Sequence, residues 1–130
     1  MAYNNRVTNV AGVLSAITAV VAYTDTSAVT IGTIPANAQI IDINIDVTTA
    51  FNAGTTNTVT VGKTGSAAAY VTATSVGTAG RASVATTGVY SAWADVGNSD
   101  VDYATVTFSQ TGAAATAGVA RVTIVYKSFA

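Results

Sequence analysis

Three polar side chains at alternating positions, Asp42, Asn44 and Asp46, form the most suggestive set of possible ligands in the chain. Their spacing matches the opening positions of a calcium-binding loop, where oxygen ligands stand at every second residue. The glycine and the distal glutamate of such a loop are missing, and the chain contains no glutamate at all. On a strand, the same spacing places the three side chains along one sheet face. We therefore expect a solvated polar stripe rather than a calcium site.

A second group of carboxylates, Asp95, Asp100 and Asp102, surrounds a turn signal at positions 97–100. Oxygen ligands can converge in a turn, so this group is a better candidate metal site than the stripe. Aspartates that cap the turn are the simpler interpretation, and we expect that role. Two carboxylates could also serve a glycosidase, but six acidic residues make some suitable pair almost unavoidable. Neither argument assigns a metal-binding or catalytic residue.

The sequence contains few of the side chains that nucleophilic catalysis requires. Histidine and cysteine are absent, which excludes a Ser-His-Asp triad, a Cys-His pair and the common zinc sites. Lys63 near Ser66 is the one local Ser-Lys candidate, and a glycine-rich hairpin end explains both residues without catalysis. The glycines that could suggest a phosphate loop do not stand between a strand and a helix; they are Gly62, Gly65, Gly77 and Gly80. We predict no catalytic, cofactor-binding or metal-binding residue, no cofactor and no enzymatic activity.

The aromatic pair Tyr90 and Trp93 offers a different kind of site, a platform on which a sugar ring could stack. Trp93 is the only tryptophan of the chain. A large aromatic side chain contributes most of its energy when it is buried. We therefore expect Trp93 to anchor the core, in a strand or a tightly packed turn over Val89–Val96.

The charge of the chain is low and nearly balanced. Only 8% of the residues are charged, against about 25% in a typical soluble domain, and the formal net charge is −1. The five basic residues do not cluster, so we expect no nucleic-acid or membrane partner. A weakly charged surface does little to oppose self-association, which favours a protein that works in an assembly. The alternative is a monomer kept in solution by its hydroxyl groups.

The elements that position these residues are predicted to be strands. Threonine and valine are abundant, Leu14 is the only leucine, and β-branched residues suit a pleated sheet. Over Gln39–Thr49, Ile41, Ile43, Ile45 and Val47 alternate with polar residues and are expected to share the buried face. Further strands are predicted at 27–34, 57–61, 70–74, near Val84, at 102–111 and at 119–127, with a loop over 62–69. Short strands with turns between them indicate an all-β, single-domain β-sandwich or small barrel.

Two β-hairpins are predicted to dominate this fold. The first spans Ile34–Lys63 and the second spans Asp102–Phe129, where the connecting loop is Gly112–Gly118. In the last strand Val122, Ile124 and Tyr126 are expected to share one face.

The N-terminal stretch Val10–Ala22 is mostly apolar and has no charge. It is too short to cross a bilayer, which takes about 20 apolar residues. It also imitates the apolar core of a signal peptide, an interpretation that we place second. Its apolar residues have helical spacing, but Gly12 and the β-branched content oppose a helix. Residues 1–26 are therefore expected to form an arm, a short helix or a first strand, ahead of the rest of one domain over 1–130.

Two segments of the chain resemble small bacteriophage capsid decoration, or cement, proteins. They are Val47–Thr64, which contains VTTAFNAGTT and TVTVGKT, and Phe108–Lys127, FSQTGAAATAGVARVTIVYK; the Pro35-Ala36 turn adds to the likeness. The resemblance implies a jelly-roll-like sandwich that binds the outer surface of a phage head. It also implies a homotrimer whose partner is the major capsid protein and whose role is to bridge capsomers and stabilise the shell.

Other functions compete with this one. The first alternative is a receptor- or glycan-binding module of a phage tail fibre or spike, which would place Tyr90 or Trp93 on the surface. A tail-tube or connector protein is another, and it would form rings. An enzyme is the least favoured, because histidine, cysteine and glutamate are all missing.

Overall fold

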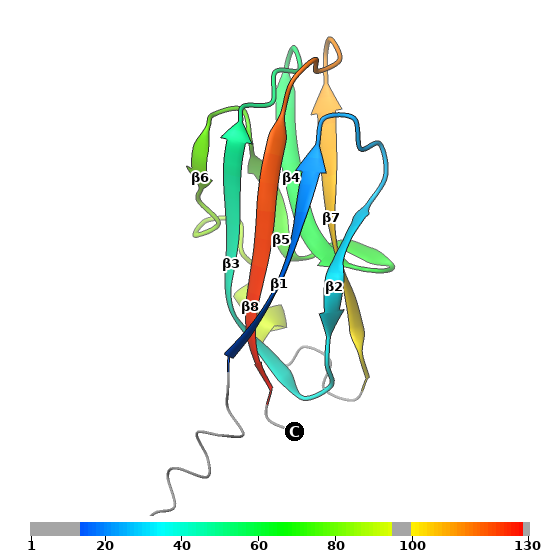
Figure 1. The fold of residues 1–130 in the computed structure, drawn as a ribbon, viewed down its shortest axis with the longest axis vertical. Helices are drawn as coiled ribbons and strands as arrows, with labels where there is room; N and C mark the ends of the chain where they lie inside the picture. Colours follow the sequence, from blue (N-terminus) through cyan, green and yellow to red (C-terminus); the bar gives the residue numbers. More distant parts are fainter. Residues whose placement is uncertain (1–13, 95–99, 129–130) are drawn as a thin grey trace, which may run out of the picture.

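The computed structural model describes residues 14–94 and 100–128 of the chain, which form eight strands and one short helix (Figure 1). The elements are β1 (Leu14–Ala22), β2 (Val29–Ile34), β3 (Ala38–Thr49), β4 (Thr56–Lys63), β5 (Ser66–Ser75), β6 (Gly80–Ala82), α2 (Tyr90–Trp93), β7 (Asp102–Thr111) and β8 (Val119–Ser128). The helix has four residues, so no helix of the described residues is long and apolar enough to cross a membrane.

The strands form two antiparallel four-stranded sheets that pack face to face. The first, sheet A, has the order β1-β8-β3-β6, and the second, sheet B, has the order β2-β7-β4-β5. The strands therefore pair as 1 with 8, 2 with 7, 3 with 6 and 4 with 5, and successive pairs alternate between the sheets. This connectivity is that of a jelly-roll-like sandwich and confirms the predicted all-β fold.

The core lies between the two sheets and is built mainly from isoleucine and valine. Strand alternation turns one side chain in two toward the opposite sheet. Ile43 and Ile45 of β3, Val59 and Val61 of β4 and Ile124 of β8 are almost fully buried. Phe51 and Phe108 add an aromatic contact, with ring centroids 4.6 Å apart. Burying each such aliphatic side chain contributes about 1.5–3 kcal/mol, which explains how a chain without disulfides holds two sheets together.

One predicted core residue, Ile41, lies on the surface instead. Its side chain is 44% exposed, whereas Ile40 is 3% exposed. The cause is a bulge in the β3–β8 ladder: Ile40 pairs with Tyr126 and Asp42 pairs with Val125, which leaves Ile41 as the extra residue. A bulge reverses the alternation on one side of it. The predicted alternation of buried and exposed side chains over Ile41–Val47 therefore holds only from Ile43 onward.

Neither predicted hairpin exists as a pair of neighbouring strands. β3 belongs to sheet A and β4 to sheet B, and β7 and β8 are likewise in different sheets. Residues 50–55 and 112–118 thus cross from one sheet to the other at the same end of the sandwich (Figure 1). Facing sheets are about 10 Å apart, a gap that loops of this length span easily. The strands themselves and the buried face of β8 are as predicted.

The true hairpin joins β4 and β5, where the sequence predicts a loop over 62–69. Both strands extend to a two-residue turn, Thr64-Gly65, and Gly65 adopts a positive φ of 87°. Glycine adopts this conformation without steric cost, so a tight turn is possible there. The alanine-rich run that looks like a loop is the first half of β5.

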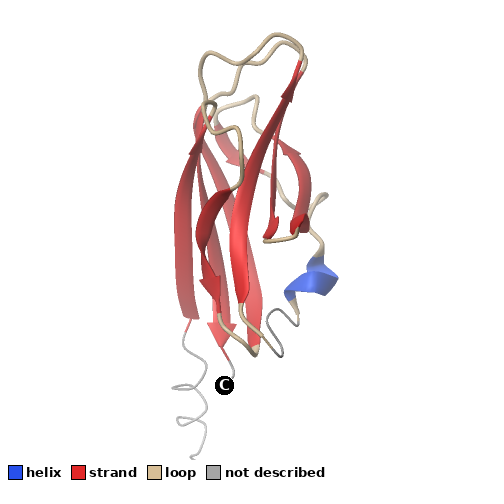
Figure 2. Ribbon diagram, turned by 90° about the vertical axis from the view of Figure 1, so that its right-hand side faces the viewer, coloured by secondary structure: helices blue, strands red, loops and turns tan. Residues whose placement is uncertain are grey.

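The remaining predictions differ from the structure in detail. Leu14–Ala22 form strand β1, which is one of the three alternatives for that stretch; residues 1–13 lie outside the described residues. The short strand expected near Val84 is β6, at Gly80–Ala82. The segment expected as a strand or tight turn contains α2, which lies at the margin of the sandwich (Figure 2). Part of the turn at 97–100 also lies outside the described residues.

Candidate functional site

A shallow depression lies at the β6 edge of sheet A. Strand β6 pairs only with Ile45–Val47, so the first half of β3 has β8 on one side and no neighbouring strand on the other side. The resulting depression has a volume of about 370 Å³. Its lining residues are Asp42, Arg81, Ala82, Ser83, Val84, Ala85 and Tyr90.

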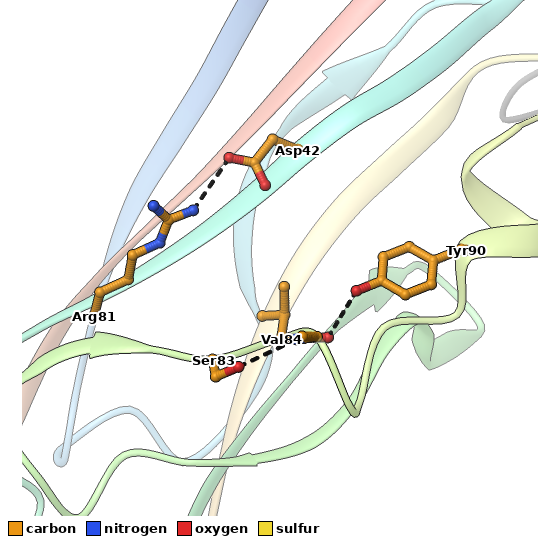
Figure 3. A network of polar contacts seen from close by, with 6 residues as sticks. Asp42, Arg81, Ser83, Val84 and Tyr90 are labelled. Atoms are coloured by element: carbon orange, nitrogen blue, oxygen red, sulfur yellow. Dashed lines mark hydrogen bonds and ion pairs between the residues drawn. The ribbon is translucent and has the colours of Figure 1, made fainter.

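Arg81 and Asp42 form the charged rim of the depression (Figure 3). The guanidinium Nη2 of Arg81 lies 3.4 Å from Oδ2 of Asp42, and both side chains are about half exposed or more, at 66% and 49%. An exposed ion pair of this kind contributes about 0–1 kcal/mol to stability. Its polar atoms therefore remain accessible to a partner.

Tyr90 forms the aromatic wall of the depression and is held by two contacts. Its hydroxyl donates a hydrogen bond to the carbonyl of Val84 at 3.2 Å. Its ring meets the ring of Trp93 nearly edge-on, with centroids 4.7 Å apart and planes at 73°. Tyr90 is 51% exposed, whereas Trp93 is 7% exposed. A half-exposed ring on a fixed support is suited to recognition by contact.

Trp93 anchors this side of the sandwich, as the sequence predicts. Its indole Nε1 donates a hydrogen bond to the carbonyl of Tyr70 on β5, at 2.9 Å. Through this bond α2 is attached to sheet B, while the depression in front of Tyr90 opens beside β3. Trp93 is thus a core residue and cannot stack on a ligand.

The predicted polar stripe on β3 is only partly exposed, with Oδ1 of Asn44 buried, and it has cationic neighbours. Asp46 is paired in register with Arg81 on β6 and Arg121 on β8. Alternate residues of a strand are about 6.7 Å apart, so Asp42, Asn44 and Asp46 do not converge on one ion. Among residues 14–94 and 100–128, no group of three or more acidic side chains could hold a metal ion.

The second acidic group is divided between different roles. Asp102 accepts a hydrogen bond from the hydroxyl of Tyr70 at 2.6 Å and lies 3.5 Å from Nζ of Lys63. Burial, and then the hydrogen bond and charge of Asp102, raise the pKa of Tyr70 well above its ordinary value. Asp100 accepts a hydrogen bond from the backbone N–H of the next residue, Val101. Asp95 lies outside the described residues.

The structure places Lys63 opposite Ser66 across the β4–β5 turn, but it does not make a catalytic pair of them. The two residues are register partners in the hairpin. The ammonium group of Lys63 is directed to Asp102. Among the described residues, the side chains of Lys63 and Ser66 form no hydrogen bond with each other. Of the four glycines considered for a phosphate loop, Gly65 and Gly80 have a positive φ and serve turns or strand ends.

Sequence reasoning did not find the depression itself. It singled out Tyr90 and Asp42 separately, but only the β3–β6 pairing brings them to one place. Arg81 was not assigned to any site, because an isolated arginine in a glycine-rich segment belongs to no recognisable sequence motif.

Comparison with solved structures finds a similar fold. No family model and no curated protein matches the chain. The fold is similar to that of a chain described as "Cyanophage Pam1 capsid asymmetric unit", with a TM-score of 0.65 and 24% sequence identity. The match covers 91% of this chain and 86% of that chain. The resemblance to phage capsid proteins noted in the sequence is therefore matched at the level of the fold.

Proposed function

We propose that this protein is a structural component of a phage virion, a capsid decoration protein that binds the outer surface of the head. The observation that carries the proposal is the likeness to a chain of a cyanophage capsid over nearly the whole fold. The chemistry of the chain is in keeping with such a role, since it lacks histidine, cysteine and glutamate, and the depression beside β6 has an exposed ion pair and a tyrosine in its lining. We infer that it has no enzymatic activity.

We further propose that its partner is the major capsid protein and that it acts as a homotrimer. A protein of this kind needs a rigid module and polar contacts that repeat over a symmetric shell. Several weak contacts made by one trimer add through effective concentration, so each contact can be weak. Arg81, Asp42 and Tyr90, at the rim of the depression, are the side chains that we expect to meet the shell.

The experiment is a binding and stability test on heads that lack the protein. Purified protein added to such heads should co-sediment with them at a fixed ratio to the major capsid protein and raise the temperature at which they rupture. Arg81→Ala removes a side chain that we expect to meet the shell, so it should weaken the binding to heads. Thr48→Ala, on the outer face of β3 away from the depression, is the control and should bind like the wild type. Absence of the protein from purified virions by mass spectrometry, together with no binding to heads, would refute the proposal.

A second function, a glycan-binding module of a tail fibre or spike, is favoured by one observation, the half-exposed ring of Tyr90. The burial of Trp93 counts against it, because only one aromatic ring is left to stack on a sugar. A glycan array decides between the two. Binding that is lost in Tyr90→Ala, combined with a low copy number per virion, would favour this second function.

A further inference from the structure

One of the two edges of sheet A is formed by β1, and this strand lacks the features that usually protect an edge strand. Its nine residues, LSAITAVVA, contain no charged residue, no proline and no glycine. Its ladder with β8 runs from Leu14 to Ala22 without a register shift, so no bulge interrupts it. Natural edge strands are normally kept from pairing with other chains by such devices. β1 is therefore open to pairing with a further strand.

The hydrogen bonds at the end of β1 show which backbone groups point outward. The N–H of Ala22 donates to Oδ2 of Asp25 at 2.7 Å, and the carbonyl of Ala22 accepts from the N–H of Asp25 at 3.0 Å. The next residue, Tyr23, donates its N–H to the carbonyl of Gly118, just before β8. Backbone groups alternate between the two sides of a strand. Even-numbered residues of β1 thus direct their N–H and C=O away from β8.

Of these outward groups, those of Ala16, Thr18 and Val20 have no backbone partner among the described residues. Asp25 occupies the position beside Ala22 and closes that end. The strand is also held firmly, because Ile17 packs directly on Gly32 of β2, where an added Cβ would lie 2.9 Å from Cγ2 of Ile17. A fixed strand loses little conformational entropy when it binds.

We propose that β1 pairs with β1 of a second copy of this chain, antiparallel and about a two-fold axis beside Thr18. This register sets Ala16 opposite Val20 of the second copy and Thr18 opposite itself, and it satisfies the outward groups with about six hydrogen bonds. Small side chains face large ones, and Val20, at 54% exposed, becomes covered. Since β1 carries no charge, two identical strands meet without repulsion. The two sheets A become one continuous sheet. This two-fold contact is additional to the threefold contacts of the proposed homotrimer, so in that assembly it joins subunits of different trimers, and it does not depend on the role in the capsid.

A single introduced cysteine tests the register, because the natural chain has none. Paired residues are about 5.5 Å apart between Cα atoms, within the range that a disulfide spans. Thr18→Cys should therefore give a disulfide-linked dimer under mild oxidation, seen on a non-reducing gel. The matched control is Thr48→Cys: Thr48 is also exposed on sheet A and, like Thr18, donates its hydroxyl to a β8 carbonyl. It should stay unlinked.

A charge at the same place gives an independent readout. Thr18→Lys sets two ammonium groups opposite each other and should lower the mass measured by light scattering by a factor of about two or more. Thr48→Lys should leave the mass unchanged, and the fluorescence of Trp93 checks that each variant is folded. An unlinked Thr18→Cys and an unchanged mass for Thr18→Lys would overturn the proposal, and would mean that residues 1–13, a different partner or solvent occupies this edge.

Discussion

The hydroxyl of Tyr70 donates a hydrogen bond of 2.6 Å to the carboxylate of Asp102, and this bond links β5 to β7 across the intervening strand β4 of sheet B. Tyr70 lies on β5 at one edge of the sheet, and Asp102 begins β7 on the far side of β4. Tyr70 is 2% exposed, and its backbone carbonyl also accepts the hydrogen bond of Trp93. Tyr70 therefore connects the lower end of sheet B with α2 and with the depression beside it.

Removal of the Tyr70 hydroxyl should destabilise the fold measurably. Tyr70→Phe leaves the partly buried carboxylate of Asp102 without its neutral donor, and hydrogen bonds to charged groups contribute about 1.5–3 kcal/mol. We expect the free energy of unfolding in urea to fall by about that amount. Tyr90→Phe is the control, because the Tyr90 hydroxyl is exposed and its loss should cost about 1 kcal/mol or less. Equal losses for the two variants would contradict the role assigned to Asp102.

The same tyrosine should make stability depend on alkaline pH. The pKa of Tyr70 is raised above the ordinary value of 10.0 in the folded protein, mainly by burial and then by Asp102. Above that pH the unfolded chain releases the proton and the folded chain retains it, so stability falls as pH rises. The fall should approach about 1.4 kcal/mol per pH unit. Urea unfolding between pH 9 and 11 measures it, and the difference between wild type and Tyr70→Phe isolates the contribution of this group.

The bulge in β3 predicts opposite outcomes for two neighbouring isoleucines. Ile40→Ala removes a side chain that is 3% exposed and should cost about 2–5 kcal/mol. Ile41→Ala removes one that is 44% exposed and should cost about 1 kcal/mol or less. Thermal or urea unfolding of the two variants gives the comparison. A larger loss for Ile41→Ala would show that β3 follows the unbroken alternation instead.

This pair of residues also shows how far sequence patterns reach. Most strands of this chain were predictable, because β-branched residues and period-two alternation depend on neighbours in the sequence, but the alanine-rich first half of β5 was not. The bulge at Ile41 was not predictable, because Ile40 and Ile41 are neighbours and an isoleucine lies on the buried face whether or not the bulge is present. Which strands pair with each other was harder still to predict. In the sequence β3 and β4 look like a hairpin, but each has one apolar face, and the loop between them is long enough to pass from one sheet to the other.

The candidate site was predictable only in part, for the same reason. Burial of Trp93 follows from its size and its uniqueness in the chain. The meeting of Asp42, Arg81 and Tyr90 depends on the β3–β6 register and on where β6 ends, and neither has a local signature. The open edge of β1 likewise becomes visible only once the sheet order is known.

The lone tryptophan provides a direct check on the placement of α2. Because Trp93 is buried and bonded to Tyr70, its fluorescence should be blue-shifted in the folded protein and should shift to the red on unfolding. Trp93→Phe keeps most of the packing but loses the indole donor, and we expect it to cost about 1–3 kcal/mol. Emission of the native protein at the wavelength of free tryptophan would mean that α2 does not pack as described.

Gly62 on β4 tests the close approach of the two strands of the true hairpin. A Cβ at Gly62 would clash with the backbone carbonyl oxygen of Ser66, so Gly62→Ala forces the backbone of the hairpin apart. Overpacking of this kind costs about 1–3 kcal/mol, and more when backbone must move. Gly77→Ala is the control, because the nearest atom to its added Cβ is 3.8 Å away, which is ordinary contact. We expect Gly77→Ala to leave the free energy of unfolding nearly unchanged and Gly62→Ala to lower it by about 3 kcal/mol in urea. If Gly62→Ala were as stable as Gly77→Ala, the β4–β5 hairpin would not close at Thr64-Gly65, and Lys63 would lose the position from which it reaches Asp102.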